Sequence, residues 1–331
     1  MAGLVFLTTA DDAAVPRETA RILGGARLGG GLPAAGWPEQ GIAAALPGIA
    51  PPALRELWLS PVDCQQGVDA GIAWRRTGDV LYGVIELDEA DFAGDARTPL
   101  QAASETAYRR VFRLLDAQGL PELWRVWNYL AAINEESHGL ERYRQFNLGR
   151  QDAFLACHRG ATGNVPAACA LGLRDGPLSI AFLAGKQPAV AVENPRQVSA
   201  YHYPADYGPR SPTFSRAALA YPPGQEILFI SGTASIVGHR SMHVGDVAAQ
   251  TRETLTNILA VLGEANRLSQ QAGFRPDQLL CRAYLRHADD WPTVAAVIEE
   301  MLGPVEVCPV VADVCRADLL VEIEAMAIAA R

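Results

Sequence analysis

The sequence predicts an α+β protein made of two related halves, in which mixed sheets pack on helices. Segments in which polar and apolar residues alternate, typical of half-buried strands, adjoin longer segments whose apolar residues recur at helical spacing. The order strand, strand, helix, strand occurs twice along the 331 residues. A chain of this length can form two domains of ordinary size.

The first half begins at about Leu54, after a stretch rich in Gly, Ala and Pro. For residues 1 to about 52 this composition predicts a short strand followed by turns and loop, without residues suited to chemistry. Beyond this stretch, GIAWRRTG, DVLYGVIELDE and ELWRVWNYLAAI read as strands, and SETAYRRVFRLLDAQG reads as a helix. These four elements form the first α+β unit.

The second half repeats this order of elements. The first strands correspond to AYPPGQEILFISGTA, the helix corresponds to TRETLTNILAVLGEA, and the strand that follows corresponds to PDQLLCRAYL. Three ordered matches of element type indicate an internal duplication. We therefore expect an N-terminal domain over residues 1–160 and a C-terminal domain over residues 161–331, with residues 194–216 as a connecting segment beside the join. Ligand sites favour such junctions.

The final strand, within DLLVEIEAMAIAA, places two carboxylates on one face. Counting with period two puts Glu322 and Glu324 on the same side, flanked by apolar residues. Residues two apart on a strand are about 6.5 to 7 Å apart, so partial burial and mutual repulsion should raise the pKa of at least one of them. A carboxyl with a raised pKa can donate a proton at neutral pH. The alternative is an exposed face that carries ordinary charges.

The connecting segment is the part of the chain most typical of a binding site. Three arginines, three tyrosines and the stiffening prolines Pro204, Pro209 and Pro212 predict a rigid loop that presents guanidinium and phenol groups to a ligand that is anionic and contains a ring. The alternative is a polar surface crossing without function.

Composition excludes several classes of protein. With 28 basic and 37 acidic residues, the net charge of −9 gives no general field for nucleic acid. No window approaches the roughly 18 apolar residues of a membrane span, and the N-terminus has no basic segment typical of a signal peptide. We therefore expect a cytoplasmic protein that binds neither nucleic acid nor membrane.

Metal and phosphate motifs are also missing from the sequence. The six cysteines form no CxxC pair and no zinc spacing, and we expect them to be reduced. Lys186 is the only lysine, and there is no GxxxxGK[ST] loop. The sequence implies no metal and no cofactor.

Several motifs together carry a resemblance to a known family. FSRAALAYPPGQEILFISGTASI, GDVAAQTRETLTNILAVL, LLCRAYLRHADDW and LLVEIEAMA are similar in order and spacing to the RidA/YjgF-like family, over roughly residues 207–331. Within that superfamily, NPRQVSAYHYP, YGPRSP, FSRA, SGTAS with VGH, and VEIEA resemble the chorismatases over about residues 140–331. This resemblance implies two YjgF-like halves, of which the N-terminal one is degenerate.

Chorismatases remove the enolpyruvyl arm of chorismate as pyruvate, and the resemblance implies that Glu322 protonates the methylene carbon of the vinyl ether. Such cleavage requires a well-placed acid. The two carboxylates of chorismate require cationic partners, for which arginine forks are suited. The implied substrate-binding residues are Arg150, Tyr207, Arg210 and Arg216, with Tyr143 as a further candidate and Gly232, Thr233 and Ser235 as the pocket floor.

The resemblance also bears on the product. A cysteine seven residues before the acid is associated with the types that form 3-hydroxybenzoate, some together with 4-hydroxybenzoate, and Cys315 occupies this position. The alternative is hydrolysis to a dihydroxycyclohexadiene carboxylate. A RidA-type imine deaminase is a third reading, but PVEVCPVV lacks the carboxylate-binding arginine that those proteins place there. RidA-like domains form trimers, so either a monomer or a homotrimer is expected.

Overall fold

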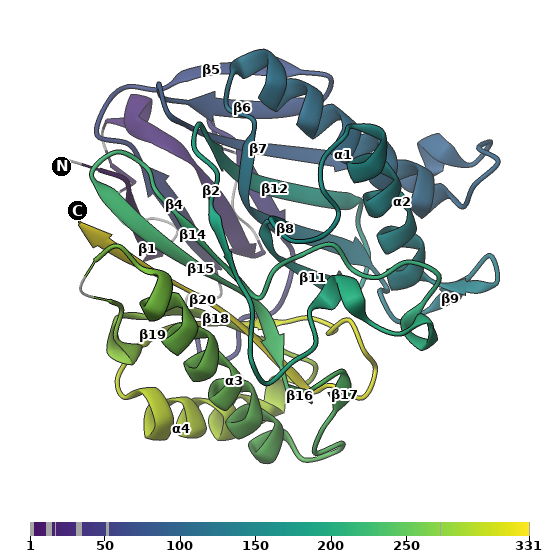
Figure 1. Cartoon of the computed structure of the whole chain (residues 1–331), viewed down its shortest axis with the longest axis vertical. Helices are drawn as coiled ribbons and strands as arrows, with labels where there is room; N and C mark the ends of the chain where they lie inside the picture. The colour runs from purple at the N-terminus through teal and green to yellow at the C-terminus, as the bar shows by residue number, and fades with distance from the viewer. Residues whose placement is uncertain are drawn as a thin grey trace.

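In the part of the chain that it describes, the computed structural model has three large sheets, two two-stranded hairpins and four α-helices in one α+β body (Figure 1). The structure describes residues 3–10, 15–16, 18–30, 35–50, 53–271 and 273–330. None of the helices in these ranges is both long enough and apolar enough to span a membrane.

The first repeat is a sheet of six strands with two helices. Its elements, in chain order, are β5 (Gln65–Asp69), β6 (Ile72–Arg76), β7 (Val80–Leu87), α1 (Pro99–Gln118), β8 (Glu122–Ala131), α2 (Arg142–Ala156), β11 (Ala167–Leu173) and β12 (Leu178–Gly185). The sheet order is β11-β8-β12-β7-β6-β5. Thr98 caps α1 at its start, and Gly119 ends it in a left-handed conformation.

The second repeat has the same topology. Its elements are β13 (Val190–Val192), β14 (Ala217–Ala220), β15 (Gln225–Ala234), α3 (Val247–Leu268), β18 (Leu280–Leu285), α4 (Trp291–Leu302), β19 (Glu306–Val311) and β20 (Val321–Ala330). The sheet order β13-β14-β15-β20-β18-β19 matches the first sheet strand for strand. The predicted duplication is therefore confirmed.

The predicted domain boundary at residue 160 needs correction. Strands β11 and β12 pair with β8 and β7, so they complete the first sheet, and the first repeat ends at Gly185. The turn-rich stretch 151–190 obscured these two strands, because it carries no helical or alternating pattern long enough to assign them to either side.

The N-terminal stretch forms a third sheet, where the sequence predicted one strand and loops. Its strands are β1 (Val5–Ala10), β2 (Ile22–Gly29), β3 (Glu39–Ile42) and β4 (Ala53–Leu59), in the order β1-β4-β2-β3. This order corresponds to β15-β20-β18-β19 of the second repeat. The glycines here serve close packing, since a Cβ atom on Gly24 would lie 2.1 Å from the ring of Tyr82.

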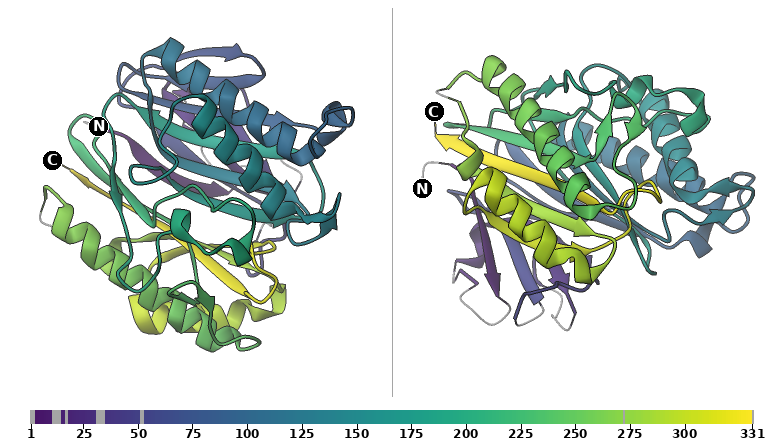
Figure 2. Two further views of the ribbon diagram at one scale, coloured as in Figure 1. Left: turned by 45° about the vertical axis from the view of Figure 1, so that its right-hand side comes forward. Right: turned by 90° about the horizontal axis from the view of Figure 1, so that it is seen from below.

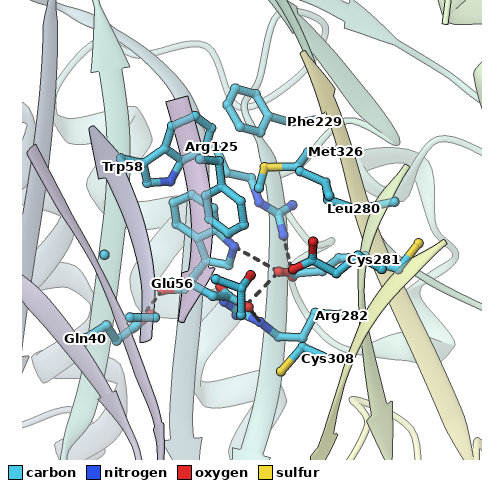
Figure 3. Close-up of a pocket in the computed structure, with 18 of the residues that line it drawn as sticks. Gln40, Glu56, Trp58, Arg125, Phe229, Leu280, Cys281, Arg282, Cys308 and Met326 are labelled. Carbon is cyan, nitrogen blue, oxygen red and sulfur yellow. Dashed lines mark hydrogen bonds and ion pairs between the residues drawn. The ribbon is translucent and has the colours of Figure 1, made fainter. Parts of the chain in front are cut away.

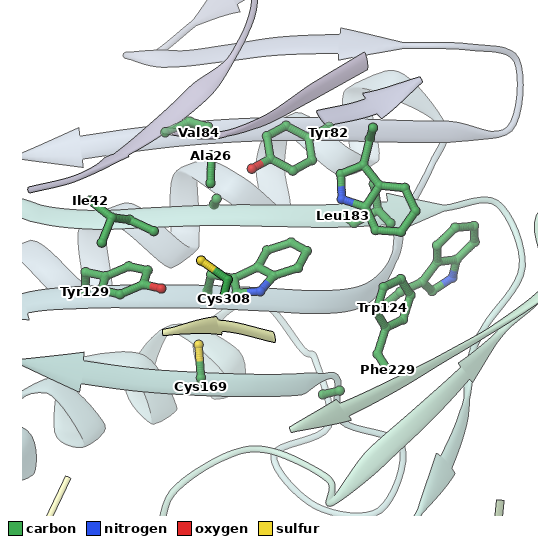
Figure 4. Packing of buried hydrophobic residues seen from close by; sticks show 14 of the residues in the cluster. Ala26, Ile42, Tyr82, Val84, Trp124, Tyr129, Cys169, Leu183, Phe229 and Cys308 are labelled. Atoms are coloured by element: carbon green, nitrogen blue, oxygen red, sulfur yellow. The ribbon is translucent and has the colours of Figure 1, made fainter. Parts of the chain in front are cut away.

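The three sheets share one apolar core. Ala26 from β2, Tyr82 from β7, Trp124 from β8 and Phe229 from β15 all belong to the same buried cluster (Figure 4). Helices α1 and α2 cover the outer face of the first sheet, and α3 and α4 that of the second. In the right-hand view of Figure 2, the purple N-terminal strands lie on one side of the yellow strand β20 and α3 lies on the other.

The two repeats join at the edge strand β11. Gly172 and Asp313 exchange two backbone hydrogen bonds, and the backbone N–H of Ala168 donates to Ser231 Oγ at 2.9 Å. The connecting segment crosses this join with two short 3-10 turns, Ala200–His202 and Ala205–Tyr207. Two small hairpins flank it, β9 (Glu136–Ser137) with β10 (Leu140–Glu141) and β16 (Ile236–Val237) with β17 (Arg240–Ser241).

Candidate active site

A cavity of about 270 Å³ lies where the connecting segment meets both repeats. We call it the main cavity. Beside it is a chamber of about 30 Å³, the side chamber, which shares five wall residues with it. The shared residues are Tyr143, Phe214, Gly232, Cys315 and Glu322. Six of the ten candidate site residues line the main cavity, namely Tyr143, Tyr207, Arg216, Gly232, Cys315 and Glu322, and Arg150 lines the side chamber.

Glu322 faces both chambers from β20 and is only 4% exposed. Burial raises the pKa of its carboxyl to about 8, and the negative charge of Glu324 adds to this shift, while Arg125 and Arg216 oppose it. At neutral pH the carboxyl is therefore protonated. This agrees with the expectation drawn from the strand pattern, and the alternative of an exposed face is excluded because both carboxylates are buried.

Gly232 in β15 makes room for this carboxyl. A Cβ atom at position 232 would lie 1.9 Å from Glu322 Oε1 and 3.2 Å from the Cβ atom of Cys169. No side chain larger than hydrogen fits there unless Glu322 moves.

Arg216 presents a partly unused guanidinium to the main cavity. Its Nη2 donates to the Val198 carbonyl and to the Tyr203 hydroxyl, each at 2.7 Å, and this fixes the plane of the group. Its Nε is buried and has no hydrogen-bond partner in the protein. A buried N–H of a charged group without a partner is costly, so an anion in the cavity would find a ready donor.

Arg150 plays the same part in the side chamber. It lies in α2, is 2% exposed, and its guanidinium carbon lies 5.3 to 5.9 Å from the ring centroids of Tyr108, Phe146 and Phe154. Its Nε and Nη2 have no hydrogen-bond partner. The aromatic rings hold the cation in place without using its donors.

Arg316 is a site residue that the sequence analysis missed. Its guanidinium carbon lies 4.1 Å from the ring centroid of Tyr207, its Nη1 donates to the His239 carbonyl at 2.9 Å, and its Nη2 is buried without a partner. It lines the main cavity. Only its position directly after Cys315 could have drawn attention to it. Other wall residues that were not predicted are Glu141, Arg144, Tyr203, Asp206, Pro212, Phe214, Ala234, Ile236 and Ala317.

Tyr207 contributes its ring to the cavity wall, while its hydroxyl is engaged inside the protein. The hydroxyl donates to the His239 carbonyl at 2.6 Å and lies 3.0 Å from His239 Nδ1. The geometry therefore favours contact of a ligand with the Tyr207 ring over a hydrogen bond from its hydroxyl.

Tyr143 and Cys315 are neutral groups in the shared wall. Burial raises the pKa of the Tyr143 phenol well above its usual value. Burial, with the nearby Glu322, raises the pKa of the Cys315 thiol to about 12. Cys315 is therefore a thiol that shapes the cavity, since the thiolate is the nucleophilic form.

Three candidate residues lie elsewhere. Arg210 keeps 45% of its side chain exposed, lies 3.7 Å from Asp152 and is not part of the cavity wall. Neither Thr233 in β15 nor Ser235, just beyond the end of that strand, lines the cavity, whereas Gly232 and Ala234 do. The hydroxyls of Thr233 and Ser235 donate to the carbonyls of Ser231 and Met242. The prediction that these hydroxyls line the pocket floor is therefore wrong.

The described residues contain no cluster of three or more His, Cys, Asp or Glu side chains able to hold a metal ion. What the site does offer is a protonated carboxyl surrounded by three guanidinium groups with unused donors. This arrangement suits a compact molecule with two negative charges that must receive a proton.

Comparisons with known proteins agree with this chemistry. Residues 56–184 match the family described as "Chorismatase FkbO/Hyg5-like, N-terminal". A chorismatase from Streptomyces hygroscopicus is 37% identical over 83% of this chain and 79% of its own length. A 3-hydroxybenzoate synthase from the same species is 35% identical over 87% of this chain and 85% of its own. A chorismatase crystal structure matches 98% of both chains, with a TM-score of 0.86 and 32% identity.

Proposed function

The chain belongs to the chorismatase family, and from this premise we propose that it cleaves the enolpyruvyl ether of chorismate to give pyruvate and 3-hydroxybenzoate. The observation that carries the proposal is the protonated carboxyl of Glu322 in the wall shared by two chambers, whose linings together include three arginines with unused donors.

Substrate binding follows from the two carboxylates of chorismate, one on the ring and one on the enolpyruvyl arm. Arg216 and Arg316 offer donors in the main cavity, and Arg150 offers donors in the side chamber. Glu322 belongs to the wall that the two chambers share. A molecule whose carboxylates reach both would hold its vinyl ether beside the acid.

The proposed reaction begins with proton transfer from Glu322 to the methylene carbon. The ether oxygen supplies the electrons, and an oxocarbenium ion forms beside the resulting carboxylate. As the bond from the ether oxygen to ring carbon 3 breaks and pyruvate leaves, the hydroxyl oxygen on carbon 4 bonds to carbon 3 and returns a proton to the Glu322 carboxylate. The resulting epoxide opens at its bond to carbon 4, which leaves the oxygen on carbon 3. Carbon 3 then loses its proton as the ring becomes aromatic, and the oxygen takes up one. Chorismate has the same atoms as pyruvate plus 3-hydroxybenzoate, so no water is consumed.

Two observations favour the benzoate product. This chain is similar in sequence to a 3-hydroxybenzoate synthase, and Cys315 lies in the wall that the two chambers share. Hydrolysis is the competing outcome. It would add one water to the oxocarbenium ion and release a dihydroxycyclohexadiene carboxylate. Formation of some 4-hydroxybenzoate would appear in the same assay.

The test is incubation of the purified protein with chorismate. Pyruvate is followed by NADH loss with lactate dehydrogenase, and the aromatic product is identified by chromatography with mass detection. We expect stoichiometric pyruvate and 3-hydroxybenzoate. Pyruvate release no faster than in buffer would reject the proposal.

We further propose that the enzyme acts as a monomer in the cytoplasm. Three sheets of equivalent topology already pack around one core within a single chain, and this leaves less apolar sheet surface for a partner. Light scattering coupled to gel filtration should give the mass of one 35.4 kDa chain. A species of three times that mass would favour the homotrimer.

A further inference from the structure

Glu324 is a second buried carboxylate, two residues beyond Glu322 on the same face of β20. It is 7% exposed and lines neither the main cavity nor the side chamber. Glu324 takes no part in the reaction proposed above. Burying a carboxylate is costly, which makes its position worth explaining.

Several donors hold Glu324 as an anion. Arg125 Nη2 lies 2.5 Å from its Oε2, Trp127 Nε1 donates to its Oε1 at 3.0 Å, and Arg282 Nη1 lies 3.4 Å from Oε1. Figure 3 shows Arg125 and Arg282 converging on this network from different sheets, together with Glu56, which pairs with Arg282. Burial raises the pKa of Glu324, but these arginines and the hydrogen bonds from Cys169 and Trp127 outweigh it, so the net pKa lies below the usual value.

Glu322 has no such partners. None of the ion pairs among the described residues includes it, although Glu322 and Glu324 are only about 7 Å apart along the strand. The thiol of Cys169, which lies in the side-chamber wall next to Glu322, directs its hydrogen bond to Glu324. Cations and hydrogen-bond donors therefore stabilise the ionised form of Glu324, whereas repulsion from Glu324 destabilises the ionised form of Glu322.

The titratable and charged groups around Glu322 come from every neighbouring element. They are Arg216 beside β14, Tyr143 and Arg150 from α2, Cys169 from β11, Cys315 and Arg316 from the loop before β20, Arg125 from β8, Tyr284 opposite Glu322 in β18, and Glu141, Arg144, Tyr203, Asp206 and Tyr207 elsewhere in the cavity wall. Glu141 is neutralised by Arg144 at 3.0 Å. Among the described residues, Glu324 is the carboxylate whose negative charge raises the pKa of Glu322.

We propose that Glu324 is a positioning residue for the reaction, whose fixed negative charge keeps Glu322 protonated and ready to donate. The inference rests on the proposed function. Two like charges this close inside a protein disfavour each other, and the one without a counterion takes up the proton.

The first test compares the pH dependence of pyruvate release in wild type and Glu324→Gln. Without the charge, Glu322 ionises more easily. We expect the alkaline fall of kcat/KM to move down by about one pH unit, with wild-type activity recovered at low pH. A merely structural role would lower activity at all pH values alike. Glu226→Gln removes an equally buried carboxylate, one that accepts from Ser269 Oγ, and should leave the profile in place.

A charge cycle keeps the test decisive if Glu324→Gln folds poorly. Arg125→Met removes a cation that stabilises ionised Glu322, so its alkaline fall should move to higher pH. Adding Glu324→Gln to Arg125→Met should move it down again. Unchanged profiles in both single variants, or no downward shift in the double variant, would overturn the inference.

A second measurement does not depend on turnover. The infrared band of a protonated carboxyl that disappears in Glu322→Gln reports the protonation of Glu322 directly. We expect its midpoint to fall by about one pH unit in Glu324→Gln. If wild type releases no pyruvate, the proposed function fails, yet this band still decides whether Glu324 controls Glu322. An unmoved midpoint would refute that control.

Discussion

The carboxyl of Glu322 occupies the space that a side chain at Gly232 would fill, since a Cβ atom there would stand 1.9 Å from Glu322 Oε1. The two residues come from adjacent strands of the second repeat, β15 and β20. The absent side chain thus determines where the proton donor can lie, and this relationship leads to the first prediction.

Gly232→Ala should lower kcat by about 100-fold or more, because displacing a catalytic group by about 1 Å costs that much. Assays of pyruvate release, with circular dichroism to check folding, measure this. The matched control is Gly263→Ala in α3, where an added Cβ meets open space and should stabilise the helix by up to about 1 kcal/mol. Full activity in Gly232→Ala would show that Glu322 need not occupy its present position.

The fold was predictable where side-chain periodicity carries the information. Counting with period two is enough to place Glu322 and Glu324 on one face of β20. The order of elements also makes β8 and β18 corresponding strands of the two repeats, and their tyrosines, Tyr129 and Tyr284, have hydroxyls 2.7 Å apart. The N-terminal sheet was not predictable, because the glycines that let β2 pack beneath Tyr82 are the same residues that indicate turns.

The site was predictable only in part, for a related reason. The family resemblance assigned Glu322, Arg150 and Arg216 to the site, and all three line its chambers. Arg316 depends on a loop that folds back onto Tyr207, a contact that no local pattern records. Arg210 and Arg216 looked alike in sequence, yet the Arg210 side chain is largely exposed and Arg216 is buried.

The pH dependence of the reaction should reveal Glu322. In the proposed reaction the protonated form of Glu322 is the active one, and the pKa of this carboxyl is raised to about 8. The value of kcat/KM should therefore stay level through neutral pH and fall about tenfold per unit above pH 8. An unperturbed glutamate would instead lose activity above about pH 4.3.

Glu322→Gln should lower kcat by about 10²- to 10⁴-fold while leaving substrate affinity within a few-fold, since the amide keeps the shape of the acid but has no proton to give. Calorimetric titration with chorismate measures the affinity. Turnover at the wild-type rate would remove Glu322 as the donor.

Arg216→Met should raise KM by about 10- to 100-fold, since a hydrogen bond to a charged group contributes about 1.5 to 3 kcal/mol. Arg210→Met is the control. Its side chain is nearly half exposed and lies outside the cavity wall, so KM should stay within about twofold. Equal effects in the two variants would mean that the connecting segment rearranges when substrate binds.

Cys315 should affect the choice of product and leave the proton transfer intact. Its thiol is neutral and lies in the wall shared by the two chambers, next to Glu322, so Cys315→Ala opens space where a water molecule could approach the oxocarbenium ion. We expect total pyruvate release within about threefold of wild type, because the acid itself is unchanged. The aromatic share should fall and the dihydroxycyclohexadiene carboxylate should appear. Chromatography with mass detection separates the two ring products, because the dihydroxycyclohexadiene carboxylate is heavier than 3-hydroxybenzoate by one water. Cys157→Ala, a half-buried cysteine outside both chambers, is the control. An unchanged product ratio in Cys315→Ala would mean that this thiol does not exclude water from the reacting carbon.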